Sequence, residues 1–132
     1  MDFTVYDVSG RAVNLSDYFG KPIVLNFWAS WCGPCKGEMP DFNEKYLELG
    51  SDVQFLMVNL TGYDNVESAR QLIVDRGYAF PVLYDTDSDA AATYSVSSLP
   101  TTYFIDAEGY LIAMANGAIN ADTLQQGIDM IS

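Results

Sequence analysis

Both cysteines of the chain lie in residues 31–36 (WCGPCK), with two residues between them. This spacing constrains the local fold more than any other feature of the sequence does. Cysteines at this spacing can close a small ring if Cys32 lies at the start of a helix and Cys35 falls one turn inside it. The free amides and the positive end of the helix dipole then favour Cys32 as a thiolate, which is the form that attacks a disulfide. We therefore predict that residues 31–36 join a strand to a helix and carry a redox-active dithiol.

The two cysteines have different expected tasks. Cys32 is the candidate nucleophile, which forms a mixed disulfide with a substrate, and Cys35 is the resolving residue, which displaces the substrate thiol. A purely structural bridge is the first alternative, but so short a loop constrains little of the unfolded chain. A zinc site is the second, and it needs two more Cys or His ligands, whereas the sequence has no histidine and no third cysteine. A metal would thus require ligands from a partner chain.

Length and charge limit the other function classes. With 132 residues, of which 49% are hydrophobic, we expect one compact domain over residues 1–132. The chain has 6 basic against 18 acidic residues and a formal net charge of -12, which repels phosphate backbones and anionic lipids. No apolar run approaches the roughly 20 residues of a membrane span, and no basic stretch precedes an apolar one at the N-terminus. We expect no nucleic-acid partner and no membrane contact by this domain.

An apolar run ends close to the dithiol. Residues 23–28 are almost wholly apolar, as expected for a strand that is buried on both faces of a largely parallel sheet. Residues 53–60 predict a second buried strand, and residues 32–49 predict the helix between the two. Together these elements form a right-handed βαβ unit, with a kink expected at Pro40, which cannot donate a helical hydrogen bond.

The rest of the chain alternates short strands and helices. Asp64 and Glu67 resemble a capping box at the start of a second crossover helix, which Gly77 ends. Further elements are expected as a hairpin of residues 3–7 and 12–15, a strand at 82–84, a helix at 88–94, a hairpin of 101–105 and 111–115, and a C-terminal helix marked by Leu124, Ile128 and Ile131.

Two segments give the chain a family resemblance. Residues 25–36 (LNFWASWCGPCK) resemble the strand-to-helix active site of thioredoxins, and residues 99–106 (LPTTYFID) resemble the loop and strand that carry their cis-proline. The resemblance implies an α/β thioredoxin fold, with three α/β/α layers around a mixed central sheet. The N-terminal hairpin and the inserted strand-helix segment at residues 62–98 are similar to the TlpA/ResA-like group, which overlaps the AhpC/TSA-type redoxins.

The resemblance also implies a proton acceptor. Glu38 and Pro40 match a glutamate and a kink proline of the TlpA/ResA-like group, and Asn26 replaces the buried aspartate of ordinary thioredoxins. Asn26 cannot ionise, so we interpret it as a satisfied polar group inside the sheet. Cys35 and Glu38 are an i, i+3 pair on a helix, and we predict that Glu38 accepts the proton of Cys35. Without the family, Glu38 would be read as a solvated helix carboxylate.

The substrate side of the site follows from the same resemblance. A cis peptide between Leu99 and Pro100 would set a backbone edge against the dithiol, where an extended substrate can pair with the main chain at Leu99. Trp31, Gly33 and Pro34 are expected to border the same substrate surface.

The resulting prediction is a thiol-disulfide oxidoreductase, a protein-disulfide reductase with no cofactor besides its own dithiol. Its expected partners are protein thiols or disulfides and an upstream electron-donor protein, and a monomer is expected. One alternative is a thiol peroxidase, although the threonine-to-cysteine motif of peroxiredoxins is replaced here by WCGPC. The other is a metallochaperone, which usually recruits a histidine. The resemblance implies an extracytoplasmic location, reached through an N-terminal anchor or export signal, with a cytoplasmic location as the alternative.

Overall fold

The apolar run before the dithiol is the central strand of a mixed sheet. The computed structural model describes residues 1–132, and β3 (Ile23–Trp28) is buried at every position. β3 runs parallel to β4 (Gln54–Asn59) and antiparallel to β6 (Thr101–Ile105). A strand with neighbours on both edges and layers on both faces has no polar side, which explains the nearly unbroken apolar run.

The sheet has seven strands in the order β2-β1-β5-β4-β3-β6-β7. The remaining strands are β1 (Thr4–Tyr6), β2 (Ala12–Asn14), β5 (Val82–Tyr84) and β7 (Leu111–Asn116). β5 is parallel to β4, whereas β1 pairs antiparallel with both β2 and β5, and β7 pairs antiparallel with β6. Both predicted hairpins are therefore present.

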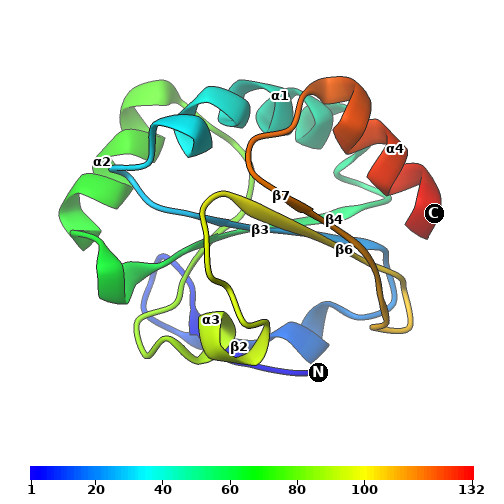
Figure 1. The fold of residues 1–132 in the computed structure, drawn as a ribbon. Helices are drawn as coiled ribbons and strands as arrows, with labels where there is room; N and C mark the ends of the chain where they lie inside the picture. The colour runs from blue at the N-terminus through cyan, green and yellow to red at the C-terminus, as the bar shows by residue number, and fades with distance from the viewer.

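Helices cover the two faces of this sheet (Figure 1). The first face carries α1 (Gly33–Leu49), α2 (Val66–Arg76) and α4 (Ala121–Ile131), which pack on one apolar core. The second face carries the short α3 (Asp89–Thr93) and the 3-10 turn η1 (Leu15–Tyr18), which contribute to a separate core. Successive β3 residues alternate between these cores. The predicted three-layer α/β/α architecture is confirmed.

The start of α2 differs from the prediction. Asn65 is the N-cap, and its side chain accepts a hydrogen bond from the Ser68 amide at 3.0 Å. The capping box predicted for Asp64 and Glu67 is wrong. The Asp64 carboxylate instead accepts hydrogen bonds from the amide and hydroxyl of Ser30, in the loop that follows β3. The predicted end is confirmed, since Gly77 adopts the left-handed conformation with φ 66°.

Glycine is required at one position where α4 meets the sheet. A Cβ atom at Gly127 would overlap the ring of Phe104 on β6. We expect Gly127→Ala to destabilise the protein by roughly 1–3 kcal/mol, because overpacking outweighs the higher helix propensity of alanine. The matched control is Gly37→Ala on α1, where the added methyl would have no atom within 4 Å apart from its chain neighbours and the backbone of its own helix. This control should gain about 0.5–1 kcal/mol. Urea unfolding of the two oxidised variants measures the difference, and equal shifts would contradict the packing argument.

Candidate active site

The dithiol lies at the N-terminus of α1, as the spacing predicts. Cys32 is the N-cap, and its Sγ accepts a hydrogen bond from the Cys35 backbone amide at 3.2 Å. The two cysteines form a disulfide, with their Cα atoms 5.3 Å apart. Cys32 keeps 4% of its surface exposed and Cys35 none. Cys32 is therefore the more accessible of the two to an incoming disulfide, and it lies at the positive end of the helix dipole.

Glu38 lies one turn further along α1 and is only 2% exposed, so the solvated interpretation is wrong. Its Oε2 accepts a hydrogen bond from Asn26 Nδ2 at 2.7 Å, and its Oε1 accepts one from the Ile119 amide at 3.1 Å. Burial raises the pKa of Glu38 to about 7, although both hydrogen bonds oppose that rise. The carboxyl group can therefore take up or release a proton near neutral pH.

Asn26 has a different environment from the one expected. Its Nδ2 donates to Glu38 and also to Thr102 Oγ1 at 3.1 Å, but its buried Oδ1 has no hydrogen-bond partner in the chain. The prediction of a fully satisfied polar group is wrong. Asn26 lies on the central strand, and its amide group is a hydrogen-bond donor that holds the carboxyl group of Glu38 in place. The sequence pattern revealed neither this contact nor the one from Ile119, because both join distant segments.

The raised pKa of Glu38 makes protein stability depend on pH. Between 4.5 and about 7, the folded state keeps a proton that the unfolded state releases. The stabilisation is complete below pH 4.5 and is lost as the pH rises through 7, by roughly 3 kcal/mol at most. We expect the free energy of unfolding of the oxidised protein to fall over this range relative to Glu38→Gln. Urea titrations of both proteins from pH 4 to 8 measure this difference, and parallel stability curves would contradict it.

A proline loop lies at the same end of the sheet. The peptide bond between Leu99 and Pro100 is cis, as the resemblance implies, and the Pro100 carbonyl accepts a hydrogen bond from the Gly117 amide at 2.8 Å. The backbone N–H and C=O of Leu99 make no hydrogen bond within the chain. Leu99 therefore has one free donor and one free acceptor for an extended polypeptide.

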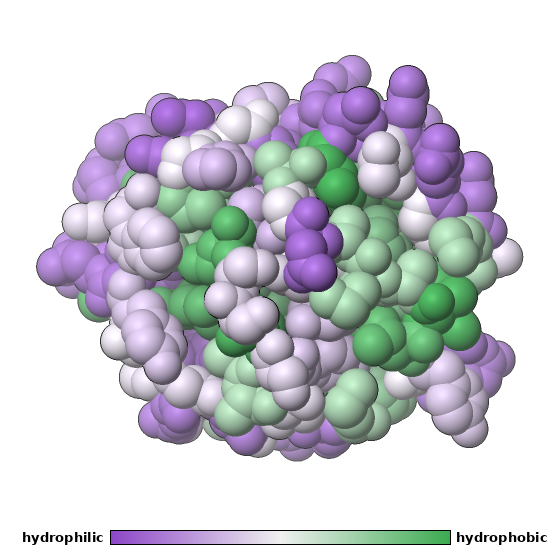
Figure 2. Space-filling view, in the orientation of Figure 1, coloured by the Kyte–Doolittle hydropathy of each residue, from purple (hydrophilic) through white to green (hydrophobic).

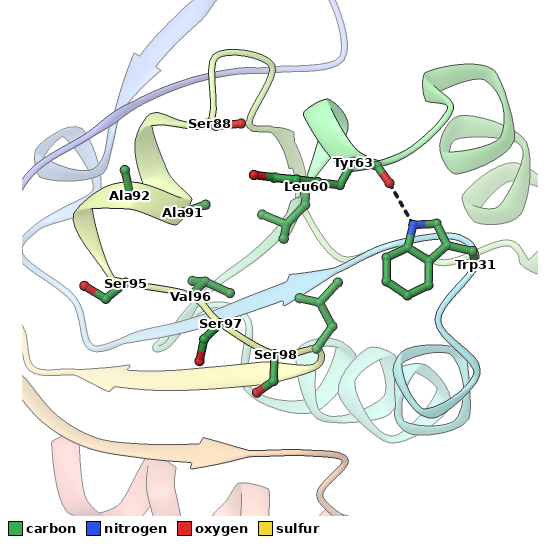
Figure 3. Close-up of a pocket in the computed structure, with 11 residues that line it drawn as sticks. Trp31, Leu60, Tyr63, Ser88, Ala91, Ala92, Ser95, Val96, Ser97 and Ser98 are labelled. Atoms are coloured by element: carbon green, nitrogen blue, oxygen red, sulfur yellow. Dashed lines mark hydrogen bonds between the residues drawn. The ribbon is translucent and has the colours of Figure 1, made fainter.

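A groove of about 660 Å³ extends from the proline loop to Trp31 (Figure 3). Trp31 is 62% exposed, and its indole N–H donates to the Tyr63 carbonyl at 2.8 Å. Gly33 and Pro34 are exposed in the first turn of α1. The residues that line the groove are Trp31, Leu60, Tyr63, Ser88, Ala91, Ala92, Ser95, Val96, Ser97, Ser98 and Leu99.

No group of three or more His, Cys, Asp or Glu side chains is arranged to hold a metal ion. None of the helices has the length and apolar character needed to cross a membrane.

Comparisons with known proteins agree with this geometry. The AhpC/TSA family model matches residues 1–114. The thiol-disulfide oxidoreductase ResA of Geobacillus thermodenitrificans is 36% identical over 98% of this chain and 74% of its own length. The exposed lipoprotein thioredoxin Etrx1 of Streptococcus pneumoniae is 36% identical, with a TM-score of 0.81 over 98% of both chains. A secreted Mycobacterium tuberculosis disulfide oxidoreductase homologous to Escherichia coli DsbE is 26% identical, with a TM-score of 0.85 over 96% of this chain and 94% of that one.

The sheet topology, the disulfide at the start of α1 and these similarities lead to one conclusion. The chain belongs to the AhpC/TSA family and is a thiol-disulfide oxidoreductase of the ResA-like group.

Proposed function

We propose that the protein reduces disulfides of other proteins through Cys32. The Cys32 thiolate attacks one sulfur of a substrate disulfide, forms a mixed disulfide and releases the first substrate thiolate. Cys35 then loses its proton and attacks Cys32 Sγ, which closes the Cys32–Cys35 disulfide and releases the second substrate thiolate. Two electrons pass to the substrate, whose thiolates take up protons. The observation that carries this proposal is the disulfide itself, with Cys32 at the N-cap and Cys35 fully buried behind it.

Glu38 is the proposed acceptor of the Cys35 proton. The two side chains are one helical turn apart, both are buried, and the pKa of Glu38 is about 7 because of burial. A base with a pKa near the working pH is partly ionised there and can still be protonated by a thiol. The hydrogen bond from Asn26 fixes the orientation of this carboxyl group.

The substrate polypeptide is proposed to lie along the proline loop. The free backbone groups of Leu99 can pair with an extended segment, and the buried Pro100 forms the wall behind it. Trp31, Gly33 and Pro34 flank Cys32 along the chain, and their exposure leaves them open to contact with the substrate.

The proposal includes a redox partner and a cellular location. The oxidised dithiol must regain two electrons and two protons, which an upstream dithiol protein supplies without any other cofactor. An extracytoplasmic location is supported by relatives described as an exposed lipoprotein and as a secreted oxidoreductase. We propose a single domain that acts as a monomer.

Reduction potential decides the direction of the reaction. We expect the dithiol to equilibrate with glutathione at a potential below about -200 mV, the range of reducing proteins of this type, and to catalyse insulin reduction. Mass spectrometry of acid-quenched mixtures gives the oxidised fraction at each glutathione ratio. A potential near -120 mV, where dithiol oxidants lie, would contradict the proposed reductase activity.

A further inference from the structure

A polar network lies at the carboxyl ends of β3 and β4, beside the dithiol but separate from it. Trp28 and Asn59 are register partners at the ends of these parallel strands. The carboxylate of Asp64 accepts hydrogen bonds from both sides of this junction. The donors are the Ser30 amide at 2.7 Å, Ser30 Oγ at 2.6 Å, Asn59 Nδ2 at 3.0 Å and the Asn65 amide at 2.7 Å.

This network anchors the segment that leads into Cys32. Ser30 lies two residues before Cys32, and Asp64 binds both its amide and its hydroxyl. The next residue, Trp31, donates to the carbonyl of Tyr63, the neighbour of Asp64. Two consecutive residues before the nucleophile are thus held by Tyr63, the last residue of η2 (Thr61–Tyr63), and by Asp64 directly after it. The proposed chemistry of the dithiol and Glu38 uses none of these contacts.

The Asp64 carboxylate can keep its hydrogen bonds to the segment before Cys32 at neutral pH, because it stays ionised there. Its partial burial opposes ionisation, but the hydrogen bonds from Ser30, Asn59 and Asn65 outweigh that effect and hold the pKa of Asp64 below its ordinary value. Asp64 therefore stays ionised at neutral pH. Hydrogen bonds to an ionised acceptor are shorter and stronger than those between neutral groups.

The anchored residues form one wall of the groove beside the dithiol. Trp31 and Tyr63 face the segment 95–98 across it (Figure 3). The groove is lined at one end by Trp31, the residue before Cys32, and also by Leu99, whose backbone groups are free. It is lined without any charged side chain, although the chain carries 18 acidic residues. This lining suits an uncharged or apolar side chain of a substrate polypeptide whose disulfide meets Cys32.

We propose that Asp64 is a positioning residue that sets affinity for polypeptide substrates, by holding Trp31 and Tyr63 as a rigid wall of this groove. The proposal rests on the proposed protein-disulfide reductase function. Asp64 acts through these neighbours and takes no part in the exchange of thiols.

Steady-state reduction of insulin tests this role. We expect Asp64→Ala to raise the KM for insulin about tenfold and to change kcat less than about twofold, since only the binding wall is loosened. The reaction of the reduced variant with the small disulfide 5,5'-dithiobis(2-nitrobenzoate), which has no polypeptide to place in the groove, should keep the wild-type rate. Asp64→Asn keeps an acceptor for some of the donors and should have an intermediate KM.

Asp7→Ala is the matched control. Asp7 Oδ1 makes the same kind of contacts in the N-terminal hairpin, where it accepts from the Ser9 amide at 2.9 Å, Ser9 Oγ at 2.7 Å and the Arg11 amide at 3.0 Å. This variant should have the KM of the wild type.

A second variant tests the hydrogen bond between Trp31 and Tyr63, the two residues of this wall. Trp31→Phe removes the indole N–H that bonds to Tyr63 and shortens the ring that lines the groove, so it should also raise the KM for insulin, even if Asp64→Ala does not fold. The proposal is overturned if either folded variant has the wild-type KM, or if the insulin and small-disulfide reactions slow equally. If the wild type fails to reduce insulin at all, the proposed function fails first.

Discussion

Cys35→Ser is expected to trap substrates as stable mixed disulfides with Cys32, and multiple turnover should fall by about three orders of magnitude or more. Cys32 remains at the N-cap of α1, where the helix dipole still favours its thiolate, so the first exchange step proceeds. The second step requires a thiolate at position 35, and the serine hydroxyl is too weak a nucleophile to replace it. Mixing the reduced variant with insulin and analysing the products by non-reducing electrophoresis and mass spectrometry measures the adduct.

Cys32→Ser is the control for this experiment. Cys35 has no exposed surface, so this variant should form no adduct and should also lose turnover. An adduct on Cys35 in the Cys32→Ser variant, with none on Cys32 in Cys35→Ser, would mean that the two roles are reversed. Applied to an extract of the source cells, the Cys35→Ser variant would also identify the physiological partners.

The fold was predictable from the sequence because its main signals are local. The apolar run at 23–28 favours a strand that is covered on both faces, and the cysteine spacing fits a helix that begins directly after it. Hairpin turns and the glycine that ends α2 are equally local. The capping of α2 was predicted wrongly for the opposite reason. Asp64 lies at a position where its carboxylate could have capped α2, but two of the donors that it accepts from are on Ser30, 34 residues away.

The active site was predictable only in part, for the same physical reason. The helical spacing of Cys35 and Glu38 follows from residue numbers, whereas the environment of Glu38 depends on contacts across the sheet. Asn26 and Ile119 are 12 and 81 residues from Glu38, and no sequence pattern links them. The carboxyl group could be named from the family resemblance, but its burial and its pKa near 7 required the structure.

Glu38→Gln should slow the attack of Cys35 on the mixed disulfide roughly 100-fold at pH 7, which is within the range of general base catalysis. In the wild type, the rate should rise as Glu38 ionises, with a midpoint near its pKa of about 7 that results from burial. Glutamine cannot accept the proton, so the variant must wait for Cys35 to ionise by itself, and an ordinary cysteine has a pKa of about 8.5. The deficit should therefore be largest near pH 7 and shrink above pH 9. Stopped-flow measurements of single-turnover insulin reduction from pH 5 to 10 provide both rate profiles.

Glu44→Gln is the matched control, because Glu44 is an exposed carboxylate on the same helix. It removes the same charge from α1 and should leave the rate and its pH profile unchanged. If Glu38→Gln and Glu44→Gln behave alike, the effect belongs to the helix charge and Glu38 is no proton acceptor. If the Glu38→Gln profile keeps its midpoint near 7, another group accepts the proton. Only a loss of that midpoint, confined to Glu38→Gln, supports the transfer of the Cys35 proton to the buried carboxyl group that Asn26 holds in place.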